Sequence, residues 1–166
     1  QNKHCLVDTT GASDNLGAWQ QCVIQSHQTD NGYQYVSTPS AQLFSIFNNM
    51  TGSIEVDQTI TGNKAFTGSG NNTVMNLNVY STKDEYGNTY VMAVNNKETS
   101  VLAVDISVDE LDLTGKEIDV WYLTSENVTD MNTLAEPDKI TVQKTTVNGS
   151  GTSINYVLQP HSVYSF

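Results

Sequence analysis

From Gly52 onward, apolar and polar residues alternate along the chain with a period of two. In the segment 74–80, Met75, Leu77 and Val79 alternate with polar asparagines. This alternation is the pattern of a β-strand with one buried face, because a helix repeats every 3.6 residues and would scatter these positions around its axis. The same alternation occurs at 54–59, and further strands are expected at 89–94, 101–108, 117–123, 139–147, 153–158 and 162–166, which makes eight in all.

Turn-forming residues separate these segments, and Asn148-Gly149 is the strongest hairpin signal among them. Short strands at nearly even spacing are typical of two packed antiparallel sheets. The chain is also rich in Thr, Asn and Ser, which favour strands and turns over helices. The sequence therefore predicts an all-β fold, namely an antiparallel two-sheet β-sandwich that is jelly-roll-like and has about eight strands.

One short helix is expected before the strands begin. Thr38 is suited to the N-cap, and Pro39 is suited to the first helical position. Leu43, Phe44 and Phe47 then share one helical face. We therefore expect a single helix to lead into the β-sandwich.

The first 38 residues differ from the rest, because they combine turn-rich polar segments with short apolar runs. We expect a loop-rich N-terminal arm at 1–38 with one or two short strands, followed by the β-sandwich domain at 39–166. Cys5 and Cys22 would close an 18-residue loop. A disulfide there stabilises the fold by about 3 kcal/mol in the chain-entropy model. Two free, buried thiols are the alternative.

Several features predict a secreted, extracellular protein. The chain begins with Gln1, which is consistent with processing or excision, and it has no apolar run long enough for a membrane span or a signal peptide. A disulfide would also fit an oxidising compartment. Four Asn-x-Ser/Thr acceptors predict a glycoprotein: Asn49, Asn71, Asn127 and Asn148.

The charge excludes two classes of partner. The chain has eighteen acidic residues and seven basic ones, all of them Lys, so the net charge is −11. Such an acidic chain, without the bidentate phosphate donor Arg, is a poor ligand for nucleic acid or for anionic lipid. We therefore expect neither a nucleic-acid nor a membrane partner.

The order of several motifs resembles the C-terminal β-sandwich domain of α-L-arabinofuranosidase-type glycoside hydrolases, and the resemblance covers about 39–166. Pro39 to Ser45 is similar to the last barrel helix of that family. The catalytic acid/base and nucleophile glutamates of the family lie on a (β/α)8 barrel, which the 38 preceding residues are too few to form. The resemblance therefore implies no catalytic residue in this chain. It rests on four further segments: 91–96, 101–106, 131–140 and 158–164.

No other pattern points to catalysis or to a bound metal. The three His are scattered, and the chain has neither a Gly-x-Ser-x-Gly elbow nor a phosphate-binding loop. A solvated acidic loop, with weak Ca²⁺ capture as the alternative, accounts for the crowded carboxylates. We expect no cofactor, no metal and no enzymatic activity. The carboxylates are Asp105, Asp109, Glu110, Asp112, Glu117 and Asp119.

Sugar binding is a separate hypothesis, since aromatic rings stack on the C–H faces of pyranoses. Trp121 and Tyr122 are neighbours on one expected strand, so their side chains point to opposite faces. Trp121 is alternatively a core anchor, and Tyr86 alternatively an ordinary exposed residue. The candidates for stacking are Trp19, Tyr86, Tyr90 and Trp121.

Three functions stay open at this point. The first is a non-catalytic extracellular structural subunit that self-associates through its N-terminal arm, because a strand-rich arm can pair with an exposed sheet edge. The second is a carbohydrate-binding or accessory module of an arabinofuranosidase-like enzyme, with polysaccharide as its partner. The third is a complete small hydrolase, which would need two carboxylates flanking one glycosidic bond.

Overall fold

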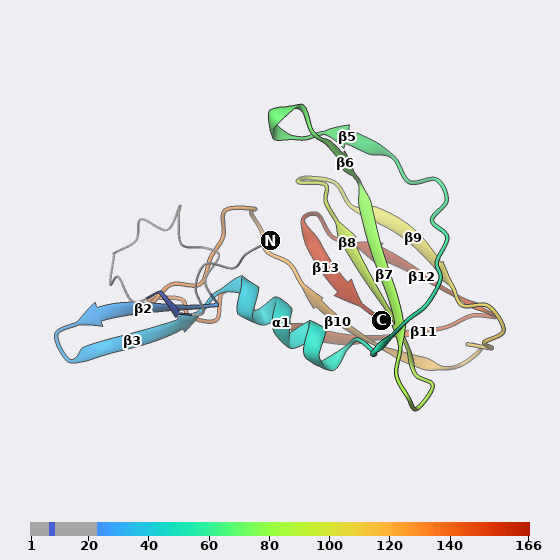
Figure 1. Ribbon diagram of the computed structural model, residues 1–166, viewed down its shortest axis with the longest axis horizontal. Coiled ribbons are helices and arrows are strands. Elements are labelled where there is room, and N and C mark those ends of the chain that lie inside the picture. The colour runs from blue at the N-terminus through green and yellow to red at the C-terminus, as the bar shows by residue number, and fades with distance from the viewer. Residues whose placement is uncertain (1–6, 9–22) are drawn as a thin grey trace.

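The computed structural model describes residues 7–8 and 23–166 (Figure 1). Cys5, Cys22 and Trp19 lie outside the described residues, so the disulfide stays a prediction. The elements are β1 (Val7–Asp8), β2 (Ile24–Thr29), β3 (Gly32–Ser37), α1 (Pro39–Asn49), β4 (Ile54–Glu55), β5 (Ala65–Thr67), a 3₁₀ turn (Ser69–Asn71), β6 (Thr73–Met75), β7 (Leu77–Lys83), β8 (Thr89–Asn95), β9 (Leu102–Ser107), β10 (Glu117–Leu123), β11 (Gln143–Asn148), β12 (Ser153–Leu158) and β13 (Ser162–Ser165).

A six-stranded antiparallel sheet forms the centre of the molecule, in the order β11-β10-β13-β8-β7-β4. Most strands that are neighbours in this sheet are not consecutive in sequence. The C-terminal β13 lies between β10 and β8, with Tyr164 opposite Tyr122 on one side and opposite Ala93 on the other. The sheet therefore forms only after segments far apart in the chain have met.

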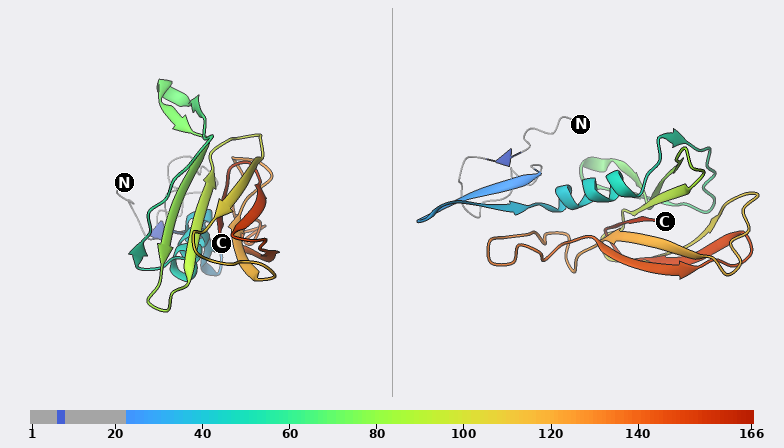
Figure 2. Two further views of the ribbon diagram at one scale, coloured as in Figure 1. Left: turned by 90° about the vertical axis from the view of Figure 1, so that its right-hand side faces the viewer. Right: turned by 90° about the horizontal axis from the view of Figure 1, so that it is seen from below.

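A second layer, the antiparallel pair β12-β9, packs over one face of this sheet (Figure 2). The core between the layers contains Val120 and Leu158, which are fully buried. Tyr122 stacks on Tyr164 at 5.1 Å between ring centroids, and Tyr156 meets both Tyr164 and Phe166 edge-on. The expectation of a mainly antiparallel all-β fold with one α-helix is confirmed for the described residues, but they form more strands than the eight expected.

Helix α1 covers the opposite face of the six-stranded sheet. Ile46 is fully buried and Met50 nearly so, in one cluster with Met92, Leu123 and Ile140. The Ser165 hydroxyl donates to the Met50 carbonyl at 2.8 Å and ties the helix exit to β13.

The start of α1 differs in one detail from the expectation. Pro39 does occupy the first turn, and Thr38 is extended in the N-cap position. The Thr38 side chain makes no cap hydrogen bond, however, because its hydroxyl donates to the Val23 carbonyl at 3.1 Å. Thr38 therefore anchors the start of β2 as well as preceding the helix.

The strand expected at 74–80 is two strands. At Asn76 the backbone bends, since its N–H donates to the Lys64 carbonyl and its carbonyl accepts from the Asn96 N–H. β6 on one side of the bend pairs with β5, and β7 on the other side pairs with β8. The β5-β6 hairpin, which was not expected, projects from the sheet (Figure 1). The strand expected at 139–147 begins later, at Gln143.

The N-terminal strands form a separate three-stranded sheet, β1-β2-β3, in which β1 is parallel and β3 antiparallel to β2. The β2-β3 hairpin extends beyond the six-stranded sheet in line with α1 (Figure 2). The division of the chain at 38/39 stays a prediction.

Candidate functional site

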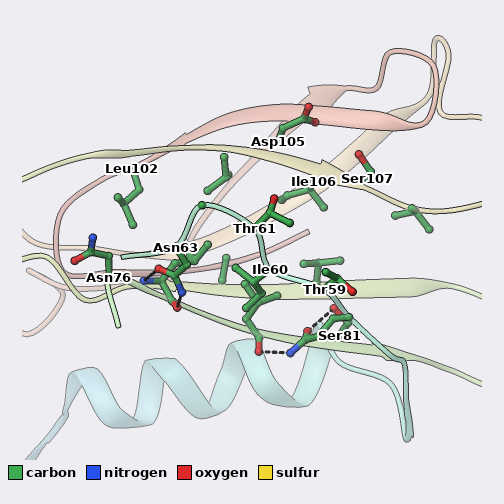
Figure 3. Close-up of a pocket in the computed structure, with 18 of the residues that line it drawn as sticks. Thr59, Ile60, Thr61, Asn63, Asn76, Ser81, Leu102, Asp105, Ile106 and Ser107 are labelled. Atoms are coloured by element: carbon green, nitrogen blue, oxygen red, sulfur yellow. Dashed lines mark hydrogen bonds between the residues drawn. The ribbon is translucent and has the colours of Figure 1, made fainter. Parts of the chain in front are cut away.

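A trough of about 960 Å³ lies between the two layers (Figure 3). It exists because six strands are faced by only two, so β7 and β8 lack a covering strand. The floor includes Leu77 and Val79 of β7 with Val91 and Ala93 of β8. The opposite wall is β9, whose Leu102, Val104 and Ile106 alternate inward and are only half-buried.

A polar segment, 56–64, lies along the mouth of the trough and closes the edge of β7. The Val56 N–H donates to the Ser81 carbonyl at 2.9 Å, and the Gln58 amide donates to the Val79 carbonyl at 2.8 Å. Asn63 both donates to the Leu77 carbonyl at 2.8 Å and accepts from the Leu77 N–H at 3.2 Å. Two side chains thus replace a neighbouring strand along this edge.

Within 7–8 and 23–166, no segment covers the facing edge of β9 in this way. Among the described strands β9 pairs only with β12, and the Val108 N–H donates to the Thr152 carbonyl just beyond the strand. Because hydrogen-bonded and non-hydrogen-bonded pairs alternate in an antiparallel ladder, Ala103, Asp105 and Ser107 direct their backbone groups to the free edge. The trough therefore combines an apolar floor with an unpaired strand edge, which is the geometry that accepts an extended chain segment.

Sugar stacking does not fit the trough, because none of its described lining residues is aromatic. The aromatic candidates lie elsewhere. Trp121 packs beside the α1 cluster, and the Lys144 ammonium lies 3.4 Å from the centroid of its ring. Tyr90 packs against the same cluster and donates its hydroxyl to Asp84 at 3.1 Å. Tyr86, at the β7-β8 turn, is 82% exposed.

The β7-β8 turn is organised around one carboxylate. Asp84 accepts hydrogen bonds from the backbone N–H groups of Tyr86 and Asn88, each at 2.9 Å, and from the Asn88 side chain at 2.8 Å. The side-chain bond from Asn88 is the largest cause that holds the pKa of Asp84 below the ordinary value of 3.8. These hydrogen bonds favour the ionised form of the Asp84 carboxyl. They also hold the backbone of the turn that carries the exposed Tyr86.

We expect the Asp84 turn to weaken on acidification. Since the folded-state pKa is depressed, the contribution of Asp84 to stability is present above the unfolded-state pKa and is lost as the pH falls through the folded-state pKa. NMR titration of the carboxyl carbon should give Asp84 a pKa below 3.8, and Asn88→Ala should raise it. A pKa at or above the ordinary value in the unmodified protein would contradict the turn geometry.

The acidic residues singled out in the sequence do not form a site. Asp105 lies on β9, Glu117 and Asp119 lie on β10, and the other three lie in the loop between these strands; all six are exposed. In the described part of the chain, no group of three or more His, Cys, Asp or Glu side chains is placed to hold a metal ion. Nor is any described helix long and apolar enough to cross a membrane.

Three buried polar residues from the motif segments form hydrogen bonds to backbone groups. The Asn95 amide donates to the carbonyls of Ser100 and Gln159, and the Ser162 hydroxyl also donates to Gln159. Asn132 donates to the Ser37 and Ile140 carbonyls and accepts from the Ile140 N–H at 2.7 Å. These motif residues therefore tie backbone segments together, and sequence reasoning missed this role because some of the partners are distant in sequence, such as Gln159 for Asn95 and Ser37 for Asn132.

The four glycosylation acceptors are all exposed. Asn49 ends α1 and donates to the Ser45 carbonyl, while Asn71 lies between β5 and β6. Asn127 lies in the loop after β10, and Asn148 ends β11.

Comparison with protein families gave one family model, the α-L-arabinofuranosidase C-terminal domain, which matches residues 21–162. No curated protein matched the chain. Among solved structures, the GH51 arabinofuranosidase from Xanthomonas axonopodis pv. citri aligns with a TM-score of 0.72 and 22% identity over 87% of this chain and 28% of its own.

An α-L-arabinofuranosidase from Thermotoga maritima, solved with arabinose, aligns with a TM-score of 0.67 and 21% identity over 87% of this chain and 31% of its own. A family 51 α-L-arabinofuranosidase from Bifidobacterium longum gives 0.68 and 17% identity, again over 87% of this chain and 28% of its own. At these identities the comparison shows a shared fold. The chain spans less than a third of the length of these enzymes.

Proposed function

Because this chain belongs to the α-L-arabinofuranosidase C-terminal domain family, we propose that it is the non-catalytic, jelly-roll-like β-sandwich domain of a larger arabinofuranosidase-type glycoside hydrolase. In that role it supports a separate catalytic part and contributes no acid/base or nucleophile of its own. The observation that carries the proposal is the trough, where β9 and the β7-β8 face lack the strand that would complete the second layer.

An extended segment of the rest of the polypeptide is the occupant that fits the trough. It would pair with the free edge of β9 and place alternate apolar side chains against Val79, Val91 and Val104. The length of the matched enzymes supports this source, since more than two thirds of each lies outside the match. A strand in the trough would also remove an edge that is prone to aggregation.

A second surface supports the same proposal. The apolar face of helix α1 is wider than the part buried on the sheet, because Phe44 and Phe47 are 49% and 41% exposed. Tyr33 and Tyr35 on the adjoining β3 are 56% and 65% exposed. An apolar helix face that extends past its contact with the sheet is typical of a helix that a further partner covers. We define these four residues as the aromatic surface, and assign it to contact with the catalytic part.

The size of the intact polypeptide tests the proposal directly. An antibody against this chain should detect, in extracts of the source organism, a polypeptide about three times the length of the chain, as the coverage of the relatives implies. The purified chain alone should release no arabinose from an aryl arabinofuranoside, whereas the longer polypeptide should. A native product of 18.2 kDa only, or turnover by the isolated chain, would overturn the proposal.

The aromatic surface gives a prediction for the isolated chain. Nile red, an uncharged dye that fluoresces on apolar surfaces, should bind the chain, and Phe44→Ser should reduce the signal without lowering the melting temperature. Tyr86→Ser is the matched control, because Tyr86 is even more exposed but lies outside this surface. Equal effects of the two substitutions would show that no continuous apolar surface is present.

We also propose that the protein is an extracellular glycoprotein, with the exposure of all four acceptor asparagines as support.

Self-association is the second candidate function, and the aromatic surface is the observation that favours it, because a second copy could cover Tyr33 and Tyr35. Light scattering distinguishes the two candidates. A monomer whose mass is unaffected by Tyr35→Ser argues against self-association, whereas an oligomer that dissociates in that variant supports it.

A further inference from the structure

Two Asn-Gly pairs occur in the chain, and they differ in how closely the surrounding residues pack against them. Asn31 lies in the turn between β2 and β3, and Gly32 begins β3 opposite Thr29; both Asn31 and Gly32 are exposed. Gly32 has φ +110°, and a Cβ added to it would meet no atom within 4 Å. Asn148-Gly149 lies at the end of β11, where Gly149 is buried.

The second pair is held tightly. The Gly149 N–H donates to the Lys116 carbonyl at 3.0 Å, and Asn148 is paired with Glu117 in the ladder. A Cβ on Gly149 would lie 2.5 Å from the Leu113 Cβ, so the backbone here is packed closely against Leu113.

We propose that Asn31 is a site of spontaneous deamidation, with water as the co-reactant, and that tertiary packing protects Asn148 from the same reaction. Glycine after asparagine promotes the reaction because no side chain blocks the attack. The Gly32 backbone nitrogen bonds to the Asn31 Cγ, the bond from Cγ to Nδ2 breaks, and ammonia leaves with the proton. Water then opens the resulting succinimide at either carbonyl, which yields aspartate or isoaspartate. No oxidant or reductant is required.

The product changes the hairpin that carries part of the aromatic surface. Either product places a new carboxylate two residues from Tyr33 and next to Asp30, in a protein of net charge −11. Isoaspartate also adds one methylene to the backbone path, which disturbs the register between Thr29 and Gly32. Deamidation would therefore make the tip of this hairpin more acidic and less regular.

The test compares the two asparagines within one molecule. The full chain, made without glycans so that Asn148 is unmodified, is incubated folded at mildly alkaline pH and analysed by peptide mass spectrometry and isoaspartate labelling. We expect Asn31 to convert at least about tenfold faster than Asn148, a difference in barrier of about 1.4 kcal/mol or more. In denaturant the two rates should become similar, because the packing around Gly149 is lost.

Asn31→Gln is the control that locates the reaction, and it should abolish the early mass increase while leaving Asn148 unchanged. Equal rates in the folded chain would overturn the proposal. So would conversion of Asn148 first, or a difference in rates that persists in denaturant, since that difference would then come from local sequence alone.

Discussion

Replacement of Asn95 by alanine is expected to lower the free energy of unfolding by about 2–4 kcal/mol. The Asn95 side chain is 1% exposed and bridges the ends of three segments. Its amide donates to Ser100, Leu158 and Gln159, and its oxygen accepts from the Lys97 N–H at 3.0 Å. Alanine leaves the Lys97 N–H without this acceptor and opens a small cavity. Urea unfolding followed by circular dichroism measures the loss.

Asn155 is the matched control for Asn95, because it is an exposed asparagine on β12. Asn155→Ala is expected to change stability by no more than about 0.5 kcal/mol, as is usual for surface positions. Comparable losses for the two variants would mean that Asn95 contributes only its strand propensity. The loss of about 2–4 kcal/mol expected for Asn95→Ala would be a large fraction of the total stability of a small domain.

Ile46→Ala is the second substitution with a large expected effect, at about 2–5 kcal/mol. Ile46 has no exposed surface and packs with Met50, Met92 and Leu123, so alanine leaves a cavity between α1 and the six-stranded sheet. Thermal and urea unfolding would both report the change. The expected loss depends on the contact of α1 with the sheet, since an exposed helix would tolerate alanine.

The neighbouring Phe47 supplies the control, because it is the larger side chain and yet 41% exposed. In the isolated chain, Phe47→Ala should cost less than Ile46→Ala. If Phe47→Ala were the more damaging variant, the helix would be rotated relative to the sheet and the aromatic surface would be part of the core. The pair therefore tests which side chains of α1 pack against this domain.

Local pattern anticipated most of the strands, because period-two alternation records which face of each strand is buried. Residues 117–123 and 153–158 form strands with the expected bounds. The helix was anticipated from Pro39 and its apolar face. The bend at Asn76 was not, because the alternation of Met75, Leu77 and Val79 continues through it while the hydrogen-bond partners change.

The candidate site was the least predictable feature. The trough depends on an unequal number of strands in the two layers, and strand order between distant segments leaves no local signal in the sequence. The same holds for Asn95 and Asn132, which the motifs singled out but whose buried roles depend on backbone carbonyls up to 95 residues away. The carboxylates of the acidic loop, by contrast, are exposed, as the interpretation of a solvated loop implies.

The sequence by itself determined the strand-rich class, the position of the helix, the acidic surface and the resemblance to one domain family, since these follow from residue types and spacings of a few positions. Tertiary structure alone decided that β13 lies between β8 and β10, that β9 keeps a free edge over the trough, and that Phe44 and Phe47 stay exposed. The physical reason is that each of these features depends on which distant segments meet. Pairing between distant strands is selected by the burial of whole faces, and residues near one another in sequence do not encode it.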